Sequence, residues 1–294
     1  MIFMNKGVVK FIFFVSLFAS SPINGQDVEN AVFWEVTGKD LKQPSYLFGT
    51  FHLMGGDYVD SLSNVVSKFE SAGTFAGEMI FDSTMTFKLM EAALMKDTTL
   101  EQLLDDETFQ QTRDWLKELS GYDLMLFNRF SPLIVEMTLL NILQQKIYKR
   151  TVVPMDIHFQ TRAHGKKNIV GLETFDEQVK ALFGSSSYAH QAQQLKEFVA
   201  EKDKARSQLF QMNNLYRRQD LRGLEKFLAD SPMSQQQKNI LLIQRNDAWM
   251  KQLPFLFIEQ STFVAVGALH LSGEHGLVRL LRNAGFTVRP LPLR

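Results

Sequence analysis

The stretch PSYLFGTFHL, residues 44–53, is matched near the other end of the chain by STFVAVGALHL, residues 261–271. Each stretch is an apolar segment that runs into glycine, two variable residues, histidine and leucine. Apolar segments rich in β-branched and aromatic residues are typical of β-strands. The two stretches therefore predict two strands that end alike, with His52 after the first and His270 after the second.

The surrounding segments predict an α/β fold. Residues 31–53 predict a β-hairpin, because two apolar runs flank a segment that contains Gly and Pro. Residues 58–73 predict a helix and residues 74–82 a further strand, an order typical of an α/β sheet. Residues 168–173 and 286–293 predict two more strands. We expect a mixed central sheet built from both ends of the chain, with large helical insertions between them.

The middle of the chain is predicted to be helical. Ser131 as a cap and Pro132 at the first helical position begin a helix that is apolar nearly all round and should be buried. Thr174 and Glu177 form a capping box for another helix. Residues 186–253 predict two or three long amphipathic helices.

Length and composition restrict the class of protein. The chain has 294 residues, of which 45% are hydrophobic, and this favours one large α/β domain over residues 26–294. The 32 Lys and Arg residues balance 32 Asp and Glu residues, so no nucleic acid partner is expected. The absence of cysteine excludes disulfides, thiolate metal ligands and a cysteine nucleophile.

The N-terminus predicts export. Lys6 and Lys10 precede an apolar run, residues 11–20, that is too short to span a bilayer comfortably. We expect residues 1–25 to be a signal peptide, with cleavage near Gly25 or Gln26. The mature protein would then be periplasmic or secreted, without an integral membrane span. A retained N-terminal membrane anchor is the alternative.

Three residues form the candidate site. Glycine before each histidine allows close approach of another backbone or a ligand, and strand ends are where open α/β sheets build their sites. His52 and His270 could therefore meet over one pocket, as metal ligands or as a base and its partner. Glu78 lies within an otherwise apolar predicted strand, where an unpaired carboxylate would be costly to bury. Two histidines and one carboxylate would leave open metal positions for water and substrate.

The remaining polar residues have simpler interpretations. Three polar residues stand beside apolar segments: Asp156, Arg245 and Asn246. We expect them to cap helices or to form salt bridges. The other four histidines are expected to be surface or locally hydrogen-bonded residues; these are His158, His164, His190 and His275. The sequence contains no H-E-x-x-H motif, Walker loop, dinucleotide glycine fingerprint or G-x-S-x-G motif. Phosphoryl transfer, nicotinamide chemistry and serine hydrolysis are therefore disfavoured.

With these residues identified, the chain resembles the TraB/GumN family, which also includes the PrgY pheromone-shutdown proteins and the Tiki proteases. The resemblance covers most of the mature chain and is carried by the paired G-x-x-H motifs and by FAGEM, MDIHFQTRAH and QRNDAWM. It implies a fold similar to the erythromycin-esterase and ChaN-like proteins. It also implies that His52, Glu78 and His270 are metal-dependent peptidase residues, and that Arg245 and Asn246 line the site.

These observations predict an exported, peptidase-like hydrolase. His52, Glu78 and His270 would hold a divalent metal such as Mn²⁺, Co²⁺ or Zn²⁺, which activates water for cleavage of a peptide or small-molecule substrate. Glu78 would be either a ligand or the general base. The alternatives are a metal-free esterase-like hydrolase with a histidine base, and a non-catalytic protein that binds peptide, metal or haem in the same cleft.

Overall fold

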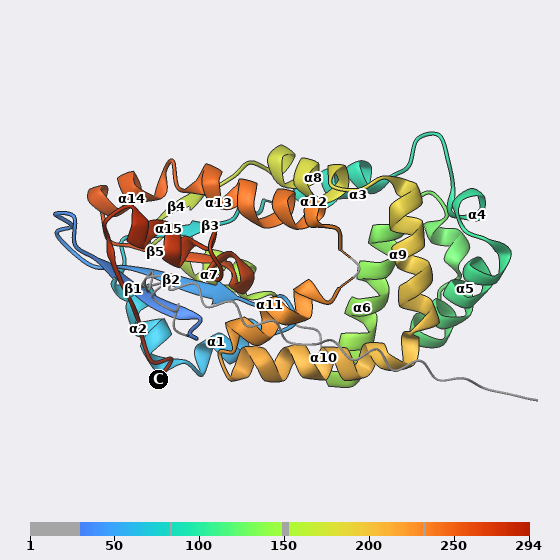
Figure 1. Cartoon of the computed structure of the whole chain (residues 1–294), viewed down its shortest axis with the longest axis horizontal. Helices are drawn as coiled ribbons and strands as arrows, with labels where there is room; N and C mark the ends of the chain where they lie inside the picture. Colours follow the sequence, from blue (N-terminus) through green and yellow to red (C-terminus); the bar gives the residue numbers. More distant parts are fainter. Residues whose placement is uncertain (1–29, 83, 149–152, 232) are drawn as a thin grey trace, which may run out of the picture.

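The computed structural model describes residues 30–82, 84–148, 153–231 and 233–294 (Figure 1). Its strands form one six-stranded sheet in the order β4-β3-β5-β2-β1-β6. They are β1 (Phe33–Thr37), β2 (Ser45–Thr50), β3 (Thr74–Gly77), β4 (Asn168–Gly171), β5 (Thr262–Gly267) and β6 (Thr287–Pro290). The four strands from β4 to β2 are parallel, while β1 pairs antiparallel with β2 and β6. The expected mixed sheet, built from both chain ends, is confirmed.

Helices account for most of the remaining described residues. The first group is α1 (Gly56–Asp60), α2 (Ser63–Ser71), α3 (Met85–Ala93), α4 (Leu100–Leu103), α5 (Asp106–Ser120), η1 (Leu124–Phe127), α6 (Pro132–Tyr148), α7 (Met155–Ala163) and α8 (Phe175–Gly184). The second is α9 (Tyr188–Ala200), α10 (Lys202–Arg217), α11 (Leu221–Ala229), α12 (Gln235–Lys238), η2 (Asn239–Ile243), α13 (Gln244–Trp249), α14 (Leu253–Glu259), η3 (Ala268–His270) and α15 (Leu277–Asn283).

The main core surrounds the sheet and is aromatic on one face. The rings of Phe48 and Phe263 pack against Phe159 of α7, and Phe263 also packs against Phe69 of α2. On the other face, the Arg282 guanidinium of α15 lies 5.5 Å from the centre of the Trp34 ring. These four phenylalanine side chains are essentially inaccessible to solvent, and so is Trp34. Their burial therefore supplies a large part of the free energy that holds the helices against the sheet.

A second core lies in the inserted helices, away from the sheet. Figure 1 shows α4, α5, α6 and α9 at the end of the molecule opposite the strands. Trp115, Leu139 and Leu195, from α5, α6 and α9, belong to this separate cluster of buried residues. Gln144 of α6 ties the block to the strand ends, because its side-chain amide donates to the main-chain oxygen of Leu53, 2.7 Å away.

Several elements differ from the sequence prediction. The helix expected over residues 58–73 is broken at Ser61 and Leu62, where the Leu62 backbone leaves the helical region and its side chain enters the core. The strand expected over residues 74–82 ends at Gly77. The helix that begins at Pro132, α6, buries Val135 and Leu139 but leaves Met137 39% exposed, so it is not buried all round.

Within the described residues, no helix is both long and apolar enough to cross a membrane. The segment expected to be a signal peptide, residues 1–25, lies outside the described residues. The single-domain assignment for residues 26–294 stays a prediction.

Candidate active site

Four parallel strands end side by side at one edge of the sheet. Their register pairs Thr50 of β2 with Gly267 of β5, Ala265 of β5 with Gly77 of β3, and Gly77 with Gly171 of β4. Each strand is followed within three residues by a chemically active side chain: His52, His270, Glu78 or Glu173. The carboxyl edge of the sheet therefore gathers the candidate residues, as open α/β sheets commonly do.

Glu78 immediately follows β3 and is held by both of its oxygens. Its Oε1 accepts the Gly267 main-chain N–H at 2.7 Å, and its Oε2 accepts a hydrogen bond from Arg245 at 2.6 Å. Burial alone would raise the pKa of Glu78, but attraction to His270, Arg245 and His52, with the Gly267 amide, lowers it to about 2. Glu78 is thus a largely buried carboxylate that remains ionised near neutral pH.

Arg245, on α13, compensates two carboxylates at once. Its guanidinium donates to Glu173 through Nε at 2.9 Å and through Nη2 at 2.7 Å, in addition to its contact with Glu78. The guanidinium also lies 4.9 Å from the centre of the Trp249 ring. Burial opposes the charge of Arg245, but Glu173 and Glu78 outweigh this effect and raise its pKa further. The fixed planar shape of arginine suits such a bidentate role, and lysine could not reproduce it.

His270 is buried and faces the same cluster. Its Nε2 lies 3.1 Å from Nη1 of Arg245 and 4.0 Å from Oε1 of Glu78. Because arginine only donates hydrogen bonds, Nε2 acts as the acceptor, so the proton of the neutral ring lies on Nδ1. Burial lowers the pKa of His270 to about 4, although the Glu78 charge opposes this shift. The ring is therefore neutral near pH 7.

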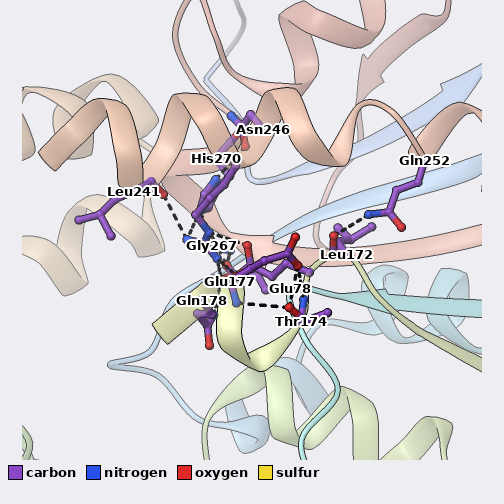
Figure 2. Close-up of polar contacts among 12 residues, drawn as sticks. Glu78, Leu172, Thr174, Glu177, Gln178, Leu241, Asn246, Gln252, Gly267 and His270 are labelled. Atoms are coloured by element: carbon purple, nitrogen blue, oxygen red, sulfur yellow. Dashed lines mark hydrogen bonds and ion pairs between the residues drawn. The ribbon is translucent and has the colours of Figure 1, made fainter. Parts of the chain in front are cut away.

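Asn246 fixes the orientation of the His270 ring. Its Oδ1 lies 2.8 Å from Nδ1 of His270, and its Nδ2 donates to the main-chain oxygens of His270 and His275, at 3.0 and 2.7 Å. Figure 2 shows Asn246 on one side of the His270 ring, with Glu78 and Gln178 on the other. One buried side chain thus orients both the imidazole and the loop that follows it.

His52 has a different environment. Its side chain is 71% exposed, and its Nδ1 lies 3.3 Å from Oδ2 of Asp156, a largely buried residue at the start of α7. Burial raises the pKa of Asp156, while His52 partly offsets the shift. The other carboxylate oxygen of Asp156 is buried without a hydrogen-bond partner among the described residues. His52 and Asp156 thus form an imidazole–carboxylate pair with one ring nitrogen left to solvent or substrate.

The two G-x-x-H motifs are therefore not equivalent in space. Gly49 is paired with Val266, not with Gly267, so the motifs are offset by one residue along the sheet. His270 lies on the 3₁₀ turn η3, whereas His52 lies in a turn in which the Met54 main-chain N–H donates to the Phe51 oxygen at 2.9 Å. A methyl group on Gly49 would lie 2.8 Å from Cα of Ala268, and one on Gly267 would lie 3.3 Å from Oε1 of Glu78. The predicted close approach of another backbone is confirmed at Gly49, whereas the neighbour of Gly267 is the Glu78 side chain.

The structure brings together Glu78, Arg245, Asn246 and His270, and leaves His52 beside Asp156. Among the described residues, no group of three or more His, Cys, Asp and Glu side chains is gathered closely enough to hold a metal ion. The three-ligand set of His52, Glu78 and His270 stays a prediction. Of the other histidines, His164, His190 and His275 are exposed, as expected, whereas His158 lies 3.0 Å from Asp60, which is 98 positions away in the chain.

Sequence reasoning missed Glu173 and the pairing of Asp156 with His52. Glu173 follows the apolar run NIVGL, much as Glu78 follows the run TFAG, so an acid just after a predicted parallel strand was the available signal. For Asp156, the sequence predicts a helix cap or a salt bridge. Its Oδ2 lies 3.3 Å from Nδ1 of His52, a candidate catalytic histidine, and spacing alone could not reveal this contact.

The fold and the site together define an α/β protein with a carboxylate–arginine–histidine centre at the carboxyl edge of a mixed sheet. The sequence profile of the TraB/PrgY/gumN family matches residues 32–290, nearly the whole chain, and the chain belongs to that family. No curated protein and no solved structure matches the chain significantly.

Proposed function

We propose that this protein is an exported hydrolase of the peptidase type, in which Glu78 and His270 hold a divalent metal ion and His52 completes the ligand set. The observation that carries the proposal is the 4.0 Å separation of His270 Nε2 and Glu78 Oε1. Neighbouring ligand atoms around a zinc ion are roughly 3–4 Å apart. Mn²⁺, Co²⁺ and Zn²⁺ are the candidate ions.

The protonation states of the two residues suit this role. Metal ligands must be deprotonated. Because the pKa is about 2 for Glu78 and about 4 for His270, both side chains are deprotonated at neutral pH. The contact between Nδ1 of His270 and Asn246 also directs Nε2 toward Glu78, the arrangement in which an outer residue orients a metal-binding imidazole. The unpartnered oxygen of Asp156 adds a further buried oxygen donor beside His52.

The surrounding residues have defined roles in this scheme. When bound, a divalent ion supplies Lewis acidity, which lowers the pKa of water and polarises a carbonyl group. Arg245 keeps its two bonds to Glu173 and presents positive charge that stabilises the oxygen of the carbonyl as it becomes negative. Glu78 is a ligand in this scheme, and Asp156, whose Oδ2 lies 3.3 Å from Nδ1 of His52, orients the His52 ring as an outer residue.

The test combines metal analysis with variants. Protein purified without chelator should contain about one equivalent of a divalent metal per chain if the site has three ligands. Glu78→Ala and His270→Ala should each lose the metal and the cleavage of a peptide library, whereas His190→Ala should behave like the parent, because His190 lies on α9, away from the cluster. Metal-loaded parent protein that cleaves no peptide but binds peptide or haem tightly would instead identify a binding protein.

A metal-free hydrolase is the second candidate, and the His52–Asp156 pair favours it. In this scheme, Nε2 of His52 accepts a proton from water as the water oxygen bonds to the carbonyl carbon, and Asp156 stabilises the charged ring. The bond from carbon to the leaving group then breaks, and His52 returns the proton to that group. Arg245 already places a positive charge beside Glu78 and Nε2 of His270 without an ion, which is compatible with this chemistry.

Chelation separates the two schemes. Dialysis against a chelator should abolish activity in the metal-dependent scheme and leave it intact in the metal-free scheme. His52→Ala removes activity in both schemes, but it reduces the metal content only if His52 is a ligand. Metal content and activity should therefore be measured on the same samples.

The export part of the proposal rests on the N-terminal sequence. Lys6, Lys10 and the short apolar run after them are the supporting features. N-terminal sequencing of protein from an envelope or secreted fraction should begin near Gln26. An intact Met1 on a cytoplasmic protein would contradict export.

A further inference from the structure

A cavity of about 250 Å³ is lined in part by Asn246, the residue whose Oδ1 contacts Nδ1 of His270. Its walls come from α11, from the continuous run α12–η2–α13, and from the loop after η3. Leu228, Leu242, Ile243 and Leu269 supply an apolar lining. A cavity of this size suits a ligand smaller than a typical drug molecule.

The helical run α12–η2–α13 separates this cavity from the candidate active site. Arg245 and Trp249, four residues apart, contact Glu78 and the His270 ring. Lys238, Leu242 and Asn246, also at four-residue spacings, line the cavity. The two sets occupy different faces of one helix. The run contains a π-helical turn, Asn239–Ile243, a feature that is rare and frequent at functional sites.

The charges of the lining favour a cation. Glu225 forms no hydrogen bond or ion pair with any described residue, and its Oε1 lies against Gly273, 2.8 Å from the position of an added methyl group. Glu274 also lines the cavity but is 77% exposed and pairs with Arg279. The ammonium of Lys238 donates to the main-chain oxygen of Ala229. Glu225 is thus a carboxylate beside apolar walls and lacks a positive partner in the described structure.

We propose that this cavity is a second binding site, for a small organic cation with an apolar body, such as an alkylamine. The ammonium would pair with Glu225, and the alkyl chain would lie against the leucine and isoleucine side chains. Bound ligand would contact Asn246, which holds Nδ1 of His270 and the main-chain oxygen of His275. Occupancy would therefore be sensed at the His270 ring without a ligand in the active site.

Calorimetric titration with n-butylamine near pH 7.5, where the amine is protonated, tests the site. We expect one molecule to bind per chain with a Kd on the order of 1 mM, the range open to so small a ligand. Glu225→Gln should weaken binding roughly tenfold or more, because it removes the charge but keeps the shape. Glu274→Gln is the matched control and should bind like the parent, since Glu274 is exposed and already paired. Glu78→Gln should also retain binding, because the active site is not involved.

Other results would overturn the proposal. No binding to correctly folded parent protein would remove the site, and n-butanol or butyrate binding as tightly as n-butylamine would remove the assignment to a cation. Loss of binding in Glu78→Gln but not in Glu225→Gln would place the amine in the active site. In ¹⁵N-histidine spectra, n-butylamine should move the His270 resonances in the parent and not in Glu225→Gln. An unmoved His270 signal at saturating amine would contradict the link through Asn246.

Discussion

The Oδ1 atom of Asn246 lies 2.8 Å from Nδ1 of His270, and both residues are almost fully buried. Arg245 donates toward Nε2 of the same ring, so the ring is held at both nitrogens. Asn246 therefore determines which nitrogen carries the proton and where the other nitrogen points. This contact links the helix α13 to the turn η3 that follows the central strand β5.

Replacing Asn246 by alanine should impair catalysis more than folding. We expect kcat to fall by about 10–100-fold, the usual effect of losing an outer residue that orients a functional imidazole. The free energy of unfolding should fall by about 1–3 kcal/mol, because buried polar groups lose their partner. Steady-state kinetics and urea unfolding measure both effects. Asp247→Ala, at the exposed next position, is the control, and an unchanged kcat in Asn246→Ala would refute the orienting role.

The pKa of His270 predicts a specific dependence of stability on pH. It is about 4 in the folded protein and 6.5 in the unfolded chain, so the unfolded chain binds more protons between these values. The contribution of His270 to the free energy of unfolding should therefore rise with pH in this window, by about 3 kcal/mol in all. This contribution is present above pH 6.5 and is lost as the pH falls toward 4. Glu136, whose pKa burial raises to about 7, contributes with the opposite sign in the parent and in His270 variants alike.

His270→Asn isolates this contribution, because asparagine does not titrate. Urea unfolding of parent and variant at several pH values between 4.5 and 7 should show that the stability of the parent, relative to that of the variant, increases as the pH rises. The lowering of the Glu78 pKa acts below pH 4.5, outside this range. Parallel slopes would show that His270 is not kept neutral by the fold.

Much of the sheet could be predicted from sequence because its strands are short apolar runs with clear ends. The hairpin of β1 and β2, the strand β5 and the final strand β6 all follow from such patterns. The break at Ser61 could not be predicted, because residues 58–73 keep a helical spacing across it. The helix breaks there because the Leu62 side chain packs into the core, and this tertiary contact outweighs the local helix preference.

The site could be predicted only in part, for geometric reasons. Glu78 and His270 follow adjacent parallel strands, so the positions of the strand ends are nearly sufficient to predict that the two side chains lie close together. The matched motifs suggested that His52 would lie like His270, but the one-residue offset between β2 and β5 is a property of pairing that no single strand encodes. The partnership of Arg245 with Glu173 likewise depends on how α13 crosses the sheet edge.

Alanine at the two motif glycines should have different effects. Gly49→Ala places a methyl group 2.8 Å from the Cα of Ala268, so the backbone must shift, and we expect a loss of about 1–3 kcal/mol in stability. Gly267→Ala meets mainly the Glu78 carboxylate at 3.3 Å, so activity should fall more than stability. Thermal unfolding and peptide cleavage assays compare the two variants. Equal losses of stability would show that neither glycine is specific to the site.

Arg245 should be the residue of the site on which folding depends most. Arg245→Met leaves Glu78 and Glu173 as two largely buried carboxylates without their shared cation, and removal of one partner from such a network costs about 3–5 kcal/mol. Arg245→Lys should lie between parent and Arg245→Met, because lysine restores the charge but not the paired bonds to Glu173. Adding Glu173→Gln to Arg245→Met should recover part of the loss, since one uncompensated charge is removed. Urea unfolding at pH 7 measures all four proteins, and a double variant no more stable than Arg245→Met would show that Arg245 acts through packing on Trp249 instead of through charge.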